Sequence, residues 1–224
     1  MEQLVDSIRV PCPHAAHGCA NKPAYHDRER HAGECAHAPC RCPASVGGAQ
    51  GASCAFAAPT GALVGHLAAA HGWPCTAEPD ARRRPFAVAL RDGFNFLSAA
   101  RGGAQHLLLL LNVATSAFGR AVSAVRLRPR AAATASSSAA PVGRNNAKCE
   151  LELKYSNYPY QLYPKGHYQT SRFEVACTDG AASNDLPDPS ASFQFFIPKY
   201  AAAGSGSDEE EAVFQVTAAI FIGS

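Results

Sequence analysis

Apolar and polar positions alternate most clearly in the second half of the chain. In CELELKY, residues 149–155, the apolar residues stand at odd positions, while Glu and Lys stand between them. The same two-residue period recurs over 214–222, and more briefly at Phe173, Val175 and Cys177. Because successive side chains of a strand point to opposite faces, this pattern predicts strands with one buried face and one wet face.

Short apolar segments recur between turn signals from residue 85 to the end of the chain. Strands are predicted near 86–91, 94–99, 106–114, 119–128, 148–155, 171–178, 192–198 and 212–222. About eight such strands without long helices predict an all-β antiparallel two-sheet sandwich over 85–224. Two polar insertions, AAATASSSAAPVG at 131–143 and GSGSDEEE at 204–211, are predicted to be exposed loops.

The first 72 residues predict small helical pieces. A short helix is expected over 25–35, and a second is expected to be capped by Thr60, to run through Leu63 and Leu67, and to stop at Gly72. Residues 73–84, WPCTAEPDARRR, are polar and interrupted by proline, so they are predicted to link this region to the sandwich.

Length and charge restrict the classes of function. A chain of 224 residues can hold a small metal-stabilised module and one larger domain. Residues 1–75 carry five Lys or Arg and five Asp or Glu, so no basic stripe supports a tandem zinc-finger nucleic-acid binder. The opening MEQLVDSIRV is no secretory signal, and the apolar run from 107 to 111 is too short for a membrane span. We expect an intracellular protein of the cytoplasm or nucleus, or both.

Cysteine and histidine fall into two consecutive sets of four. The first is Cys-x6-Cys-x11-His-x3-Cys, and the second is Cys-x13-Cys-x11-His-x4-His. Zinc closes a structural site with four such ligands at the corners of a tetrahedron, and the repeated x11 gap indicates an internal repeat. The pattern predicts two structural Zn²⁺ ions, held by Cys12, Cys19, His31 and Cys35 and by Cys40, Cys54, His66 and His71.

One ligand of the second set is left open by spacing. Cys40 and Cys42 both precede Cys54, and only one of them can complete a four-ligand site. The remaining histidines of this region are expected to face solvent, because eight positions already satisfy both ions; they are His14, His17, His26 and His37.

This ligand order, with its Cys-x-Cys-Pro step, resembles the SIAH-type zinc finger of the Seven in absentia family of RING E3 ubiquitin ligases. SIRVPCPHAAHGC, residues 7–19, is similar to the segment that follows the RING finger in the Sina-like branch. The resemblance assigns Cys40, with Cys42 as its alternative, to the second site. This chain has more residues between Cys42 and Cys54 than the family usually has, and it contains no C-x2-C pair with which a RING would begin.

The resemblance implies a small α+β module of tandem zinc fingers over 12–72, after an N-terminal lead over 1–11 that lacks the RING. A TRAF-like substrate-binding β-sandwich is implied over 85–224. By kinship the protein would bind substrate proteins through extended degron peptides, form homodimers or heterodimers with family members, and promote ubiquitination and proteasomal degradation. Without its RING it would engage an E2 only if another chain supplied one. The alternative is that the chain is a RING-less substrate-binding adaptor or competitor without ligase activity.

No catalytic constellation is visible in the sequence. G-x-S-x-G, H-E-x-x-H and G-x-x-x-x-G-K-[ST] are all absent. A zinc ion with four protein ligands has no open position for water, so neither ion is expected to perform hydrolysis. We therefore expect no catalytic residues and no membrane or nucleic-acid partner, and the substrate groove is not assigned.

Overall fold

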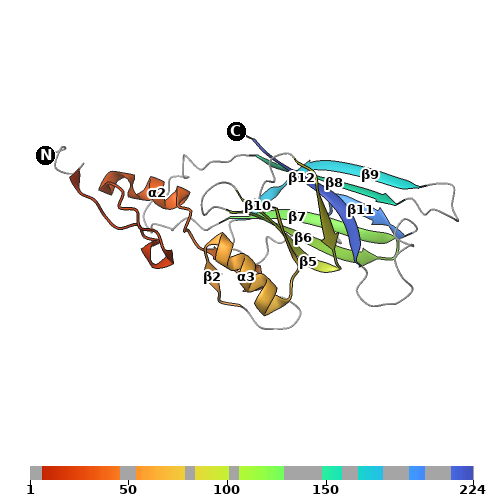
Figure 1. The fold of residues 1–224 in the computed structure, drawn as a ribbon, viewed down its shortest axis with the longest axis horizontal. Helices are drawn as coiled ribbons and strands as arrows, with labels where there is room; N and C mark the ends of the chain where they lie inside the picture. The colour runs from red at the N-terminus through yellow and green to blue at the C-terminus, as the bar shows by residue number, and fades with distance from the viewer. Residues whose placement is uncertain are drawn as a thin grey trace.

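The computed structural model describes residues 7–45, 54–78, 84–100, 106–128, 148–157, 166–178, 192–199 and 213–223. Figure 1 shows an elongated molecule with α2 near one end and a body of long strands at the other. The predicted insertions at 131–143 and 204–211 lie outside the described residues. Among the described residues, no helix is long and apolar enough to cross a membrane.

Between residues 15 and 71, the described elements are short and lie around the cysteines and histidines. They are the 3-10 turns η1 (Ala15–His17), η2 (Tyr25–Asp27) and η3 (Pro43–Ser45), the helices α2 (Arg28–Glu34) and α3 (Thr60–His71), and the strands β1 (Cys40–Arg41) and β2 (Ala57–Ala58). β1 and β2 pair antiparallel, with Cys40 opposite Ala58. Both predicted helices are therefore present.

The sequence predicts the end of helix α3 correctly but not its beginning. Pro59 is the N-cap, and Thr60 is the first helical residue with no side-chain capping bond, so the predicted Thr60 cap is wrong. Gly72 ends the helix as predicted, with a left-handed φ of 63°. Its N–H donates to the Ala68 carbonyl, which is the 5→1 bond of an αL motif, and Trp73 N–H donates to the Leu67 carbonyl.

The described strands between residues 75 and 222 form two sheets. The larger has the order β10-β7-β6-β5-β3 with β11 also paired to β7, and the smaller has the order β4-β12-β8-β9. The bounds are β3 (Cys75–Glu78), β4 (Phe86–Leu90), β5 (Gly93–Ala100), β6 (His106–Ser116), β7 (Gly119–Leu127), β8 (Cys149–Asn157), β9 (His167–Glu174), β10 (Ala176–Thr178), β11 (Phe195–Pro198) and β12 (Phe214–Ile222). Each predicted strand from residue 86 onward has a counterpart here.

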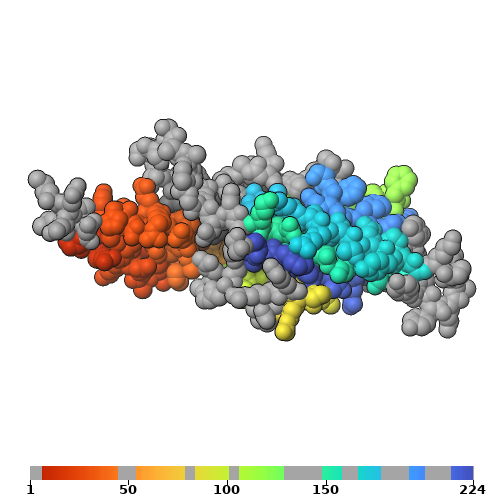
Figure 2. All heavy atoms as spheres, turned by 90° about the horizontal axis from the view of Figure 1, so that it is seen from above, coloured from red at the N-terminus to blue at the C-terminus, as the bar shows by residue number. Residues whose placement is uncertain are grey.

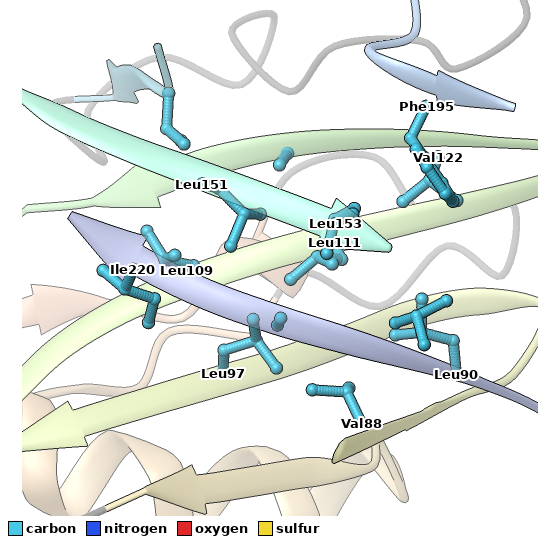
Figure 3. Close-up of a cluster of buried hydrophobic side chains, with 14 of the residues drawn as sticks. Val88, Leu90, Leu97, Leu109, Leu111, Val122, Leu151, Leu153, Phe195 and Ile220 are labelled. Atoms are coloured by element: carbon cyan, nitrogen blue, oxygen red, sulfur yellow. The ribbon is translucent and has the colours of Figure 1, made fainter. Parts of the chain in front are cut away.

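One apolar cluster joins the two sheets. Leu109 and Leu111 of β6 pack in it together with Leu151 and Leu153 of β8 and with Ile220 of β12. Figure 3 shows side chains of both sheets directed into the space between them. The two-residue period of CELELKY is confirmed, since its four odd positions are buried. Each fully buried leucine contributes roughly 1.5–3 kcal/mol to this core.

The strand predicted over 171–178 is divided between the two sheets. β9 pairs antiparallel with β8 in the smaller sheet, whereas β10 pairs parallel with β7 in the larger one. The change occurs at Val175, which is buried and donates its N–H to the Cys149 carbonyl. The predicted burial of Cys177 is wrong, because beyond this step the side chain is exposed.

The predicted linker over 73–84 is partly a strand. Residues 75–78 form β3, which pairs parallel with β5 and extends the larger sheet. Together with β10, this parallel pairing departs from the all-antiparallel prediction. The chain thus passes from α3 into the sandwich within a few residues.

The outer face of the larger sheet is covered by the second cysteine and histidine unit. Leu63 and Leu67 of α3 pack in one buried cluster with Phe96, Leu108 and Leu110 of the sheet. Figure 1 shows α3 beside β5 and β6 at the end of the sandwich nearest α2. Figure 2 shows the residues of the first unit gathered at one end, while β8, β9 and β12 form the visible face of the body.

Candidate metal centres

The first predicted ligand set comes together in space. Cys12 and Cys19 flank the turn η1, whose C-cap Gly18 takes a left-handed φ of 94° and reverses the chain just before the second thiol. His31 lies in the last turn of α2, and Cys35 is the C-cap of that helix. Their ligand atoms all lie within 4.8 Å of one another. A tight turn and one helix end therefore bring four residues to a single point.

The spacing of these atoms is that of a tetrahedral zinc site. Cys12 Sγ lies 3.8 Å from Cys35 Sγ, and His31 Nε2 lies 3.2 Å from Cys12 Sγ and 3.5 Å from Cys19 Sγ. With Zn–S near 2.3 Å and Zn–N near 2.0–2.1 Å, tetrahedral edges are about 3.8 Å between sulfurs and about 3.6 Å between sulfur and nitrogen. The residues fit a zinc ion at their centre.

Neighbouring groups orient and shield this first set. All three cysteines are buried and His31 is partly buried. The backbone N–H of His14 donates to Cys12 Sγ at 3.3 Å, and the side-chain amide of Asn21 lies 3.4 Å from His31 Nδ1. Such contacts fix the direction of a ligand and support charge on its sulfur or imidazole. The backbone N–H of Asn21 lowers the pKa of the Cys19 thiol, whereas burial raises that of Cys35.

The prediction that His14 faces solvent is wrong. Its side chain is 6 % exposed, and burial lowers its pKa. The first unit has a buried cluster made only of its three cysteines and Ala38, so it offers little apolar material of its own. Of the other three histidines, His26 is exposed as predicted, and His17 and His37 are half-buried.

The second cluster contains Cys42, Cys54, His66 and His71, with ligand atoms again within 4.8 Å of one another. Cys42 Sγ lies 3.3 Å from His71 Nε2, and Cys54 Sγ lies 3.3 Å from His66 Nε2. Both histidines belong to α3, and the two cysteines lie beside the β1–β2 pair. These distances are close to the edge of about 3.6 Å expected for a sulfur–nitrogen pair on zinc.

Cys42, not Cys40, is the fourth member of the second cluster, so the assignment of Cys40 is corrected in favour of its alternative. Cys40 and Cys42 are both buried in the apolar cluster with Leu63 and Leu67, but only Cys42 belongs to the group whose ligand atoms lie within 4.8 Å of one another. Burial raises the pKa of the Cys40 thiol to about 12 and also raises the pKa of the ligand thiols Cys35 and Cys42, so position and not pKa separates Cys40 from the ligands. Cys42 follows the end of β1 and donates its N–H to the Phe56 carbonyl, which anchors it beside the segment that carries Cys54.

The two clusters fit two structural zinc ions. Each offers four protein ligands, so a bound ion keeps no open position for a substrate or an activated water. In the described part of the chain, these are the groups of His, Cys, Asp and Glu that could hold a metal. Both clusters are therefore structural metal sites that stabilise the fold, as the sequence predicted.

The sequence did not predict that aromatic rings stack on the histidines of the second cluster. Phe56 is 37 % exposed and stacks on the His66 ring at a centroid distance of 3.9 Å. Trp73, assigned to a linker, stacks on His71 at 4.9 Å and on Phe96 of β5 at 5.5 Å. The available signal was the position of a lone tryptophan two residues after the last ligand.

Comparison with protein families agrees with this geometry. Residues 3–78 match the family described as Sina, zinc finger. No curated protein matches the chain. The matched range contains both ligand clusters and ends with β3, the strand that enters the larger sheet. Over residues 3–78, the chain is therefore similar to the zinc finger of the Sina family.

Proposed function

We propose that this chain is a substrate-recognition protein of the ubiquitin pathway, of the Seven in absentia type. In this proposal the sandwich is a TRAF-like domain that binds extended degron segments of target proteins, and the zinc fingers hold it in place. The observation that carries the proposal is the Sina-type zinc finger, which continues through β3 directly into a β body. Binding would promote ubiquitination of the target and its degradation by the proteasome.

The chemistry of the metal clusters supports a binding role. Both have four protein ligands, so the ions have no position at which to activate a substrate. Function then belongs to the surface that the ions hold in place. A sandwich offers extended peptides the edges of its sheets, where a peptide can add as a further strand. In the described part of the chain, β4 and β9 are the edges of the smaller sheet.

A RING-less adaptor or competitor is the second candidate. The 224 residues contain no C-x2-C pair, and eight of their cysteines and histidines are used by the two clusters. We propose that the chain pairs with itself or with a family member, and that an E2 is reached only through a RING supplied by such a partner. Positional catalysis of this kind works by proximity between the charged E2 and a substrate lysine.

A peptide array tests substrate recognition. The purified, zinc-loaded chain is applied to overlapping peptides, and each bound peptide is then scanned with proline. Strand addition requires backbone N–H groups on alternate residues, so we expect proline to abolish binding at every second position. Binding that tolerates proline at every position, or an array without bound peptides, would contradict the proposed recognition mode.

A ubiquitination assay separates the two candidates. With E1 and E2 alone, this exact chain is expected to form no ubiquitin chains. Added to a RING-bearing Sina-type ligase, it should raise ubiquitination of a bound target if it is an adaptor and lower it if it is a competitor. Robust ubiquitin chain formation by this chain alone would overturn the prediction that it lacks ligase activity.

A further inference from the structure

The second cysteine and histidine unit, here called the second finger, shares one buried cluster with the sandwich. Leu63 and Leu67 of α3 are fully buried, and they pack with Phe96, Leu108 and Leu110 of the larger sheet. The zinc ligands His66 and His71 belong to the same helix. One helix of 12 residues therefore carries both half of a metal cluster and the side chains that cover the sheet.

Trp73 continues this connection beyond the helix. Its ring lies between His71 and the sheet, with centroids 4.9 Å from His71, 4.9 Å from Phe94 and 5.5 Å from Phe96. The next residue, Pro74, accepts the backbone N–H of Phe96 at 2.9 Å. Each residue between His71 and β3 is thus held by a contact with the end of α3 or with the larger sheet.

The first finger has no such support among the described residues. Its buried cluster consists of Cys12, Cys19, Cys35 and Ala38, with no side chain of the sandwich. The ligand sets alone give no reason for the second site to bind zinc more tightly, because the first site has the additional thiolate. Any advantage of the second site must come from the protein that surrounds it.

We propose that the second zinc site is a latch between finger and sandwich. Its ion holds α3 and Trp73 over the apolar outer face of the larger sheet, and this face in turn positions two ligands before the ion binds. Coupling of this kind is reciprocal, since the docked helix favours the ion by the same factor that the ion favours docking. The second site therefore holds zinc more tightly than the first, and loss of its ion uncovers the sheet.

Stepwise chelation of the full, zinc-loaded chain tests the latch. A chromophoric chelator reports released zinc, while the emission of Trp73, the single tryptophan, reports the interface. We expect two phases that differ roughly tenfold or more in affinity. The first phase should leave the emission unchanged, and the second should shift it to the red. Release in one phase, or an emission change in the first phase, would overturn the proposal.

Variants at each cluster assign the phases to their sites. His31→Ala should remove the early phase, and Cys54→Ala should remove the late one, because each residue belongs to a different cluster. If His31→Ala removes the late phase instead, the first site is the tighter one and the latch is refuted.

A matched pair of leucines on β6 tests the coupling itself. Leu110 faces the finger, whereas its neighbour Leu109 faces the core of the sandwich, and both are buried. Leu110→Ala should weaken the late phase roughly tenfold and leave the early phase unchanged. Leu109→Ala should lower the stability of the sandwich without changing the ratio of the two zinc affinities.

A milder pair keeps the test decisive if the alanine variants do not fold. Leu110→Val and Leu109→Val remove less volume from the same two positions, and only the first is expected to weaken the late phase, by a few-fold. Equal effects of the two positions on the late phase, or no effect of either, would show that the sheet does not support the second ion.

Discussion

Substitution of Cys40 and Cys42, one at a time, tests the ligand assignment of the second cluster. Cys42 Sγ lies 3.3 Å from His71 Nε2, whereas Cys40 is not among the four residues whose ligand atoms lie within 4.8 Å of one another. Cys42→Ala should therefore reduce the zinc content from two ions per chain to one. Cys40→Ala should retain both ions, although it changes a residue that is also buried and only two positions away.

The two variants should also differ in stability. Cys40→Ala removes one buried sulfur, which costs about 1 kcal/mol and lowers Tm by about 2–4 °C in a chain of this size. Cys42→Ala loses the linkage energy of the second ion. At free zinc near 1,000 times Kd this is about 4 kcal/mol, so Tm should fall by about 8–16 °C.

Zinc analysis by mass spectrometry and thermal unfolding on the same samples measure both quantities. Loss of an ion from Cys40→Ala, with two ions kept by Cys42→Ala, would contradict the assignment of Cys42. This assignment would also be refuted if both variants kept two ions, since either thiol would then complete the site equally well.

Two further predictions concern backbone space and pH. Gly119→Ala should destabilise the sandwich by about 2–3 kcal/mol in urea unfolding, because the new Cβ would overlap the Ile197 carbonyl of β11. Gly65→Ala, on the open surface of α3, should instead stabilise by about 0.5–1 kcal/mol, and equal effects would contradict this account. Burial raises the pKa of the Cys35 and Cys42 thiols, so at neutral pH zinc must displace their protons. Zinc affinity should therefore fall as pH falls from 8 to 6, and a flat profile by chelator competition would contradict it.

The metal clusters were largely predictable because their ligands are specified by residue type and spacing. The first set is recovered in full, and three ligands of the second set are recovered too. The choice between Cys40 and Cys42 was not predictable from strand alternation, since residues two apart point to the same face of an extended chain. Pairing of β1 with β2, followed by the bond from Cys42 N–H to Phe56, selects the second of these thiols.

The strands were predictable because their faces differ in polarity, whereas their pairing was not. A short segment such as β3 shows no alternation of apolar and polar residues. Its parallel pairing with β5 is set by the surrounding tertiary structure and not by its own sequence. The sequence does indicate that both faces of the larger sheet are buried. Residues 107–111 of β6 are all leucine, and a run without alternation indicates burial on both faces. What covers the second face depends on tertiary packing, which spacing does not encode.

X-ray absorption at the zinc edge of the fully loaded chain tests the two closed sites most directly. The first cluster offers three sulfurs and one nitrogen and the second offers two of each, an average of 2.5 sulfur and 1.5 nitrogen ligands per ion. We expect this average with Zn–S near 2.3 Å and four-coordinate zinc, at two ions per chain. A coordination number above four, an oxygen ligand on either ion, or a single ion per chain would contradict it.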